Sequence, residues 1–269
     1  MDRREAILRE LNLYPLWKRR GTAAPAPRAA EPDLVIQPEV PVPVTATSAV
    51  HAAESPAIMV EQAVKAESSH APVVIPRSDV AELDWSALKQ RVSECTACKL
   101  RAGCTQTVFG VGDEQADWLF VGEGPGAEED ALGEPFVGQA GKLLDNMLIA
   151  IRLKRGKNVY IANIVKCRPP GNRNPDAEEI AACLPYLQRQ IELIRPKLIV
   201  ALGKVASNAL LSRDATLASL RGKLHDYHGT PLIVTYHPAY LLRSPNEKAK
   251  AWQDLTMAVR VGRGEGNSN

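Results

Sequence analysis

The pattern of apolar and polar positions divides the chain into two parts, and only the second is patterned like a folded domain. Four near-continuous apolar runs are typical of strands buried on both faces, and they lie at 117–121, 159–165, 198–202 and 232–235. Apolar residues at helical spacing occur around these runs, at 83–94, 141–152, 176–194, 204–212 and 247–261. The alternation predicts an α/β fold with a mostly parallel four-stranded sheet covered on both faces.

The first part of the chain has a different composition. Residues 1–20 have apolar residues at helical spacing and predict an amphipathic helix, which is either a weakly ordered terminus or a docking element for a protein partner. Residues 21–80 contain nine of the 20 prolines, one glycine and no aromatic residue. Because this tract is too long for a loop in a compact domain, residues 21–82 are predicted to form a disordered Pro/Ala-rich linker. The predicted domain is 83–262, followed by a disordered tail at 263–269.

Composition narrows the class of protein. The net charge is +2, so affinity for a polyanion has to come from a local patch rather than from the whole surface. The first 20 residues contain no apolar signal region, and no apolar run approaches the roughly 18 residues of a membrane span. The five cysteines are odd in number, which argues against a disulfide framework and for a reducing compartment. A soluble, cytoplasmic protein is expected.

The most informative segment is GEGPGAEEDALGEPFVGQAG, at 122–141, directly after the first apolar run. Glycine allows the backbone to approach a ligand closely. Ligands of open α/β sheets bind beyond the carboxyl ends of the strands. Glu123 and Phe136 are therefore expected to contact a small planar ligand. The segment KLHDYHGTP, at 223–231, is interpreted as a solvent-facing turn.

Two further strand ends carry polar side chains. Asn163 lies near the end of the second run, and its amide either reads the edge of a base or caps a turn. The basic residues that follow form either a phosphate clamp or a solvated surface, and they are Lys166, Arg168 and Arg173. His237 lies where the last strand stops. The residues after it combine apolar wedges with a cation, as in proteins that enter a base stack, and they are Leu241, Leu242 and Arg243.

Four of the five cysteines have the spacing of a metal centre. Cys95 and Cys98 form a C-x-x-C pair, Cys167 follows the second apolar run, and Cys183 lies within the predicted helix 176–194. This set suits four-thiolate ligation of either zinc or an iron–sulfur cluster, and the spacing does not choose between them. Separate buried structural cysteines are the alternative. Because four thiolates leave no open position for a substrate, the role of such a centre would be architectural.

The motifs occur in one order along the chain. They are GEGPG at 122–126, EPFVGQAGKLLD at 134–145, NIVKCRPPGNRNP at 163–175 and HPAYLLR at 237–243. With the four cysteines, they resemble the family 4 uracil-DNA glycosylases, the iron–sulfur branch of the uracil-DNA glycosylase superfamily, over roughly 84–261. The resemblance implies a three-layer α/β/α sandwich and a [4Fe–4S] cluster. It also implies hydrolysis of the N-glycosidic bond of uracil in DNA, the step that begins base excision repair.

The resemblance also assigns roles. The cluster ligands would be Cys95, Cys98, Cys167 and Cys183, with Cys104 left without a role. Glu123 would position or activate water, and His237 would face the O2 oxygen of uracil. The uracil-binding residues would be Phe136 as the stacking ring, Asn163 at the base edge, Gly124 through its backbone amide, and Glu129 as a guard against the 5-methyl group of thymine.

These roles agree with the chemistry of the reaction. Uracil has to be rotated out of a duplex before it can be held by stacking and edge hydrogen bonds, and Leu241 or Leu242 would fill the gap. The expected partner is uracil-containing DNA, single- or double-stranded, bound by a monomer. The alternatives are a non-catalytic iron–sulfur protein that binds DNA and a covalent uracil trap. Trapping relatives carry a histidine in the basic loop, and residues 166–180 contain none.

Overall fold

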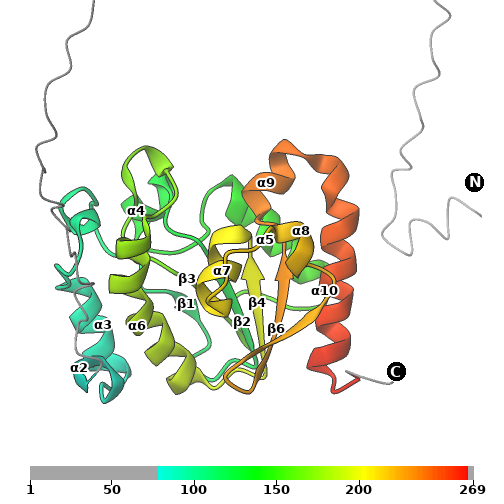
Figure 1. Cartoon of the computed structure of the whole chain (residues 1–269), viewed down its shortest axis with the longest axis horizontal. Helices are drawn as coiled ribbons and strands as arrows, with labels where there is room; N and C mark the ends of the chain where they lie inside the picture. The colour runs from blue at the N-terminus through cyan, green and yellow to red at the C-terminus, as the bar shows by residue number, and fades with distance from the viewer. Residues whose placement is uncertain (1–77, 266–269) are drawn as a thin grey trace, which may run out of the picture. The chain divides into compact units, whose positions relative to one another are not determined.

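A mostly parallel sheet forms the centre of the computed structural model, which describes residues 78–265 (Figure 1). The predicted helix at 1–20, the linker up to residue 77 and residues 266–269 lie outside the described residues. The sheet has six strands in the order β1-β3-β2-β4-β6-β5. Its four parallel strands are β2 (Trp118–Gly122), β3 (Val159–Asn163), β4 (Leu198–Leu202) and β6 (Thr230–Thr235). These strands fall on the four apolar runs, which confirms the predicted parallel core.

Two short strands at the edges were not predicted. β1 (Val111–Gly112) pairs antiparallel with β3, and β5 (Leu224–Tyr227) pairs antiparallel with β6. The prediction of a four-stranded sheet is therefore wrong by two strands. β5 lies in the segment interpreted as a turn, and only Tyr227 of its residues is buried. An edge strand that is mostly exposed carries no apolar run, so the sequence pattern does not show it.

The longer helices fall close to their predicted positions. They are α3 (Trp85–Ser93), α5 (Gln139–Ala150), α6 (Ala177–Ile194), α7 (Lys204–Leu211) and α10 (Lys248–Gly262). Short elements fill the connections: α4 (Ala127–Leu132), α8 (Leu217–Leu220), α9 (Pro238–Arg243) and the 3-10 turns η1 (Lys99–Ala102), η2 (Pro170–Asn172) and η3 (Pro245–Glu247). Within the described residues, no helix is both long and apolar enough to cross a membrane.

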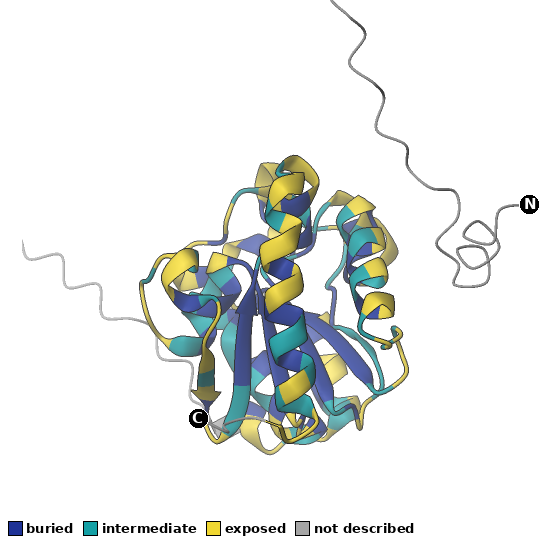
Figure 2. Ribbon diagram, turned by 90° about the vertical axis from the view of Figure 1, so that its right-hand side faces the viewer, coloured by how far each residue is buried: buried dark blue, intermediate teal, exposed yellow. Residues whose placement is uncertain are grey.

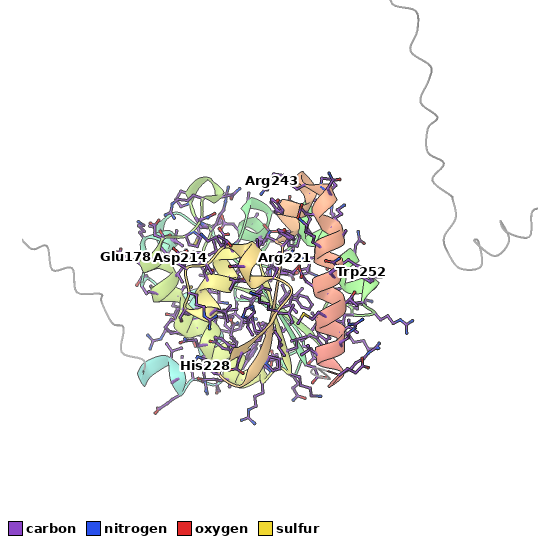
Figure 3. All side chains as sticks on the ribbon, turned by 45° about the vertical axis from the view of Figure 1, so that its right-hand side comes forward. Glu178, Asp214, Arg221, His228, Arg243 and Trp252 are labelled. Carbon is purple, nitrogen blue, oxygen red and sulfur yellow. The ribbon has the colours of Figure 1, made fainter. Side chains whose placement is uncertain are left out.

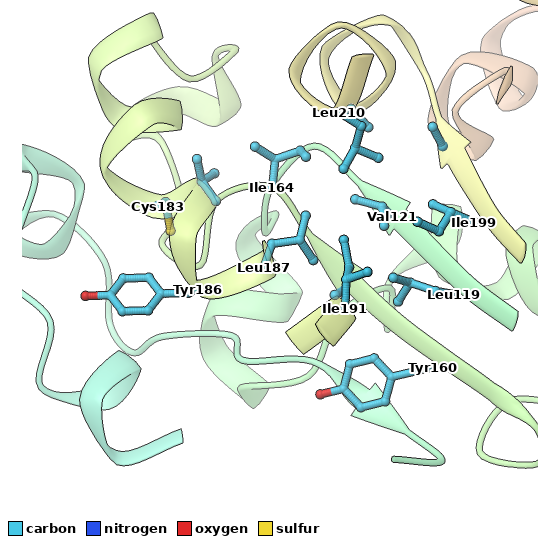
Figure 4. Close-up of a cluster of buried hydrophobic side chains, with 14 of the residues drawn as sticks. Leu119, Val121, Tyr160, Ile164, Cys183, Tyr186, Leu187, Ile191, Ile199 and Leu210 are labelled. Atoms are coloured by element: carbon cyan, nitrogen blue, oxygen red, sulfur yellow. The ribbon is translucent and has the colours of Figure 1, made fainter. Parts of the chain in front are cut away.

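Alternate residues of the strands face two separate cores, which gives three layers. Leu119 and Val121 of β2 face one core together with side chains of α3, α6 and α7 (Figure 4). Phe120, between them, faces the other core together with side chains of α5 and α10. The residues of the parallel strands are mostly buried (dark blue in Figure 2), whereas many residues on the outer faces of the helices are exposed (yellow). Burial on both faces explains why these strands are apolar without alternation.

The folded part begins before the predicted boundary at residue 83. Residues Ser78–Ala81 form the helix α2, which packs against α6, and Val80 is only 6% exposed. The prediction of a linker through residue 82 is therefore wrong for these residues. A four-residue helix after a proline-rich tract has too short a pattern to be recognised from apolar spacing.

Candidate active site

Four predicted site residues line one pocket at the carboxyl edge of the sheet. Glu123 follows the end of β2, Asn163 ends β3 and His237 lies two residues beyond β6. Because these strands run parallel, their carboxyl ends meet at the same edge, and Gly122 pairs directly with Asn163. Phe136 comes from the loop between α4 and α5. The pocket that these residues share has a volume of about 400 Å³.

The ring of Phe136 forms one wall of the pocket. It stacks on the imidazole of His237, with ring centroids 5.4 Å apart and planes at 30°. Phe136 has a φ of 56°, a left-handed conformation that is unfavourable for an aromatic residue. A Cβ atom at Gly122 would collide with this ring and with the amide oxygen of Asn163. The glycine at the end of β2 is therefore required by the ring and the amide that lie against it.

Arg155 holds the backbone of this wall, a role that no sequence motif indicates. Its guanidinium donates to the carbonyl oxygens of Pro135 (2.9 Å) and Phe136 (2.8 Å) and to the carboxylate of Asp145 (2.9 Å). Gly141 lets the helix α5 approach, because a Cβ atom there would collide with the carbonyl of Phe136. These contacts hold the unfavourable conformation of Phe136 in place.

The carboxylate of Glu123 is half-buried in the pocket, and burial raises its pKa above the usual range. No ion pair within residues 78–265 involves this carboxylate. A carboxylate in such a place is available to a positive charge that develops on a ligand.

The imidazole of His237 is held in its neutral form with a defined direction. Burial, assisted by the positive charge of Arg243, lowers its pKa to about 4. His237 is the N-cap of α9, and its Nδ1 accepts a hydrogen bond from the backbone N–H of Ala239 at 3.2 Å. Because Nδ1 accepts, the proton of the neutral ring lies on Nε2. Nε2 is therefore a hydrogen-bond donor that carries no positive charge.

Asn163 is 2% exposed, and its amide oxygen is buried without a hydrogen-bond partner among the described residues. Native structures rarely leave a buried polar atom unpaired. The orphaned oxygen lies in the wall of the pocket, so a ligand with a donor group would satisfy it. Gly124 also lines the pocket, and a Cβ atom there would come 2.7 Å from the side chain of Val165.

Glu129 lines the same pocket, but its oxygens are engaged. One carboxylate oxygen accepts from the backbone N–H groups of Val137 and Gly138, both at 3.0 Å. The other accepts from Gly126 at 3.1 Å. Glu129 therefore ties the loop after β2 to the loop that carries Phe136. Its predicted action against thymine stays a prediction.

The basic loop after β3 divides into buried and accessible parts. Lys166 is 1% exposed, and its Nζ donates to the carbonyl of Asn163 (3.0 Å) and to the Oε1 of Gln190 (2.7 Å). The prediction that Lys166 contacts DNA phosphate is therefore wrong, because its charge is enclosed by protein. Arg168 donates to Asn172, and Arg173 lines the pocket while it forms a two-point ion pair with Glu179.

The segment after His237 is a helix, α9, rather than a loop. Leu241 is 1% exposed and Leu242 is 43% exposed. The prediction of Leu241 as a wedge is therefore wrong, because its side chain is part of the protein interior. Leu242 remains available, and Arg243 is exposed on the same helix and lines the pocket.

The four predicted cysteine ligands line a second, smaller cavity beside α6. These residues are Cys95, Cys98, Cys167 and Cys183. The hydroxyl of Tyr186 donates to the sulfur of Cys95 at 3.2 Å, and the backbone N–H of Lys166 donates to the sulfur of Cys183 at 3.2 Å. Hydrogen bonds of this kind favour thiolate sulfurs.

The thiols are not gathered tightly around a single point. Within residues 78–265, no group of three or more His, Cys, Asp or Glu side chains is arranged to hold a metal ion. Burial raises the pKa of Cys98 and Cys167 and raises that of Cys183 to about 12. Four soft sulfur donors that share one cavity nevertheless match the donor set of an iron–sulfur cluster, which is larger than one ion. Cys104 does not line the cavity, although its thiol contacts that of Cys167.

Comparison with known proteins shows the family. The profile of the uracil DNA glycosylase superfamily matches residues 109–256, which is more than half of the chain, and the chain belongs to this superfamily. The type-4 uracil-DNA glycosylase of Pyrobaculum aerophilum is 40% identical over 185 residues, which cover 65% of this chain and 93% of that protein. The type-4 enzymes of Thermotoga maritima and Archaeoglobus fulgidus are 45% and 44% identical, over 61% and 62% of this chain and 85% and 87% of their own lengths.

Proposed function

We propose that this chain is a uracil-DNA glycosylase that hydrolyses the N-glycosidic bond of uracil flipped out of DNA. The observation that carries the proposal is the convergence of Glu123, Phe136, Asn163 and His237 on one pocket. An aromatic wall, an amide with an unpaired oxygen, a neutral donor and a carboxylate are the groups that this reaction needs. The similarity to type-4 uracil-DNA glycosylases supports the same activity.

Substrate binding follows from the walls of the pocket. A flipped pyrimidine stacks on Phe136, as flipped bases do on aromatic side chains. The amide of Asn163 pairs with the edge of uracil, and the N3–H of the base supplies the donor that its buried oxygen lacks. Cytosine presents an acceptor at N3 and a donor at N4, so it would leave buried groups unpaired. Such mismatches give rejection on the order of 10⁴-fold.

Bond cleavage places negative charge on the departing base and positive charge on the sugar. The Nε2–H of His237 donates to the O2 oxygen as its charge develops. A neutral imidazole is sufficient for this role, because it stabilises the charge on O2 by donating a hydrogen bond and does not have to transfer its proton to the base. Glu123 stabilises the cationic sugar and orients the water that attacks it. Burial raises the pKa of its carboxyl, and no ion pair within residues 78–265 involves it, so it is available to the positive charge that develops on the sugar.

The DNA strand is held at the rim of the pocket. Leu242 is the exposed side chain available to enter the gap left by uracil. Arg243, Arg168 and Arg173 supply positive charge for phosphates around the opening. Lys166 is excluded from this role because its Nζ is enclosed by Asn163 and Gln190.

For the cysteine cavity, we propose that Cys95, Cys98, Cys167 and Cys183 hold a [4Fe–4S] cluster. Such a cluster would supply cross-linking rather than catalysis, because four cysteine ligands would leave no position open to a substrate. It would join the segment before η1 to the loop after β3 and to α6. Iron and sulfide content and the visible absorption of the purified protein test this assignment, and a colourless protein that contains zinc would overturn it.

A labelled oligonucleotide that carries one uracil tests the function. We expect alkali-sensitive strand breaks at the uracil, with many turnovers for each enzyme molecule, and no breaks when cytosine or thymine occupies the same position. A complex that survives denaturant would indicate a covalent trap. Bound but intact DNA would indicate a non-catalytic binding protein. Either of these results would overturn the proposal.

A further inference from the structure

The pocket contains an aromatic side chain that the uracil site does not use. Tyr240 lies on α9, lines the pocket and is 38% exposed. The proposed reaction already has its stacking ring in Phe136, which comes from a different segment, the loop between α4 and α5. Leaving a large aromatic ring exposed at the mouth of a nucleic-acid site suggests that it has a ligand of its own.

The ring of Tyr240 is supported from below by an ordered stack. It lies against Tyr236, with centroids 5.1 Å apart and planes at 21°. The guanidinium of Arg221 lies over the ring of Tyr236, 4.3 Å from its centroid. Tyr236 therefore contacts both Arg221 and Tyr240.

The lower part of this stack is fixed by further contacts. Arg221 donates to the carboxylate of Asp254 and to the carbonyl of Lys250, both at 2.7 Å. The hydroxyl of Tyr236 donates to Glu247, and the hydrogen bonds from Lys250 and, to a smaller extent, from Tyr236 lower the pKa of that carboxyl. Tyr240 is therefore a ring whose orientation is set before any ligand arrives, and stacking on a fixed ring requires little further ordering.

A cation accompanies the ring. Arg243 follows Tyr240 by three residues on α9, a spacing that places two side chains on the same helix face, and both line the pocket. The pocket, at about 400 Å³, is within the range that holds drug-sized ligands, and a single pyrimidine is considerably smaller. There is room at the mouth for part of a neighbouring nucleotide.

We infer that Tyr240 is a stacking platform for the base of a nucleotide adjacent to the flipped uracil, with Arg243 at the phosphate of that nucleotide. The inference rests on the proposed function and adds a second base-binding position to it. Base–aromatic stacking tolerates any sequence, so the platform would favour single-stranded or locally opened DNA without choosing the neighbouring base.

Tyr240→Ala and Tyr240→Phe test the platform in the full-length protein, with Trp252→Ala as the matched control. Trp252 is an exposed aromatic residue on α10 that does not line the pocket (Figure 3). On a single-stranded uracil oligonucleotide, we expect Tyr240→Ala to raise KM and the Kd by about tenfold, with kcat within about twofold. Tyr240→Phe restores wild-type values because it keeps the ring, and Trp252→Ala leaves them unchanged.

Oligonucleotides that lack one base beside the uracil complete the test. Removing the contacted base should weaken binding to the wild type by about tenfold and should have no effect on Tyr240→Ala, because the interaction is already absent. The inference would be overturned if an abasic unit on either side of the uracil weakened binding equally in the wild type and in Tyr240→Ala. Continued excision of uracil in that case would leave the proposed function intact. Failure of the wild type to excise uracil would instead overturn the proposed function, and the Kd values would still measure the coupling.

Discussion

The uracil pocket and the cysteine cavity share no lining residue and adjoin only at the end of β3 and the loop after it, and they differ in what they need in order to be complete. In the pocket, protein contacts already set the working groups: Ala239 directs the ring of His237, and Arg155 fixes the backbone of Phe136. In the cavity, burial raises the pKa of Cys98, Cys167 and Cys183, so these thiols stay protonated until a metal centre displaces their protons. Changes in the pocket should therefore affect chemistry, and changes in the cavity should affect stability.

Lys166 connects the two regions. Its Nζ holds the carbonyl of Asn163, while its backbone N–H reaches the sulfur of Cys183. A metal centre in the cavity would thus fix the strand end that carries the amide proposed to pair with uracil, without contacting the substrate. The two regions share Lys166 as a support but are not expected to share a function.

The largest effect is expected from Cys167→Ser, which removes a buried ligand. We expect loss of bound iron and of visible absorption, and a fall in Tm of about 10 °C or more, because structural metal binding contributes many kcal/mol to folding. Cys104→Ser is the control, because Cys104 does not line the cavity and should keep iron and Tm. Retention of iron by Cys167→Ser would contradict the proposed ligand set.

His237→Ala should have the next largest effect, and the effect should be mainly on chemistry. Loss of a donor aimed at developing negative charge lowers kcat by about 10²- to 10³-fold. His237→Asn keeps an N–H donor and a side chain suited to the N-cap of α9, so it should retain more activity. Iron content should be unchanged in both, and Tm should fall by a few degrees in His237→Ala because α9 loses its N-cap. Single-turnover kinetics measure the loss, and an equal loss in the two variants would argue against the donor role.

Asn163→Ala should reduce kcat/KM on uracil by about 10- to 100-fold, because it leaves the polar edge of the base unpaired in a buried site. The control is Asn208→Ala on α7. Asn208 also has a buried amide oxygen without a partner in the described part of the chain, but it lies away from the pocket. Steady-state kinetics should show no change for the control. An unchanged kcat/KM in Asn163→Ala would remove the amide from the recognition of uracil.

The smallest effect concerns pH. The pKa of His237 is about 4 in the folded protein and about 6.5 when unfolded. As pH falls from about 6.5 towards 4, the unfolded chain binds a proton that the folded protein does not, so stability decreases. The fall in Tm between pH 7 and pH 5 should be smaller by a few degrees in His237→Asn than in the wild type.

The pH dependence of activity distinguishes the titration of Glu123 from that of His237. Burial raises the pKa of Glu123, and the carboxylate form is the active one, so activity should fall as pH drops through that raised value. The acid limb should be the same in wild type and His237→Asn. A limb that moved with the histidine substitution would show that His237 has to change charge during the reaction.

The sequence by itself determined the parallel core and the positions of the main helices. Strands buried on both faces have to be apolar throughout, and the sequences of β2, β3 and β4 meet this requirement within the strands themselves. The same pattern placed Glu123, Asn163 and His237 at one edge, because the carboxyl ends of parallel strands coincide. The glycines around Phe136 marked the remaining wall through their local backbone requirements.

Only the tertiary structure decided which polar and apolar side chains are inside. Lys166 is buried because Gln190, 24 residues further along the chain, accepts its hydrogen bond. Leu241 is buried and Leu242 exposed because the segment after His237 coils into α9 rather than forming a loop. The contribution of Arg155 likewise depends on Pro135 and Phe136, about 20 residues earlier in the chain. Local patterns record what a residue prefers, whereas burial depends on which distant residues fold against it.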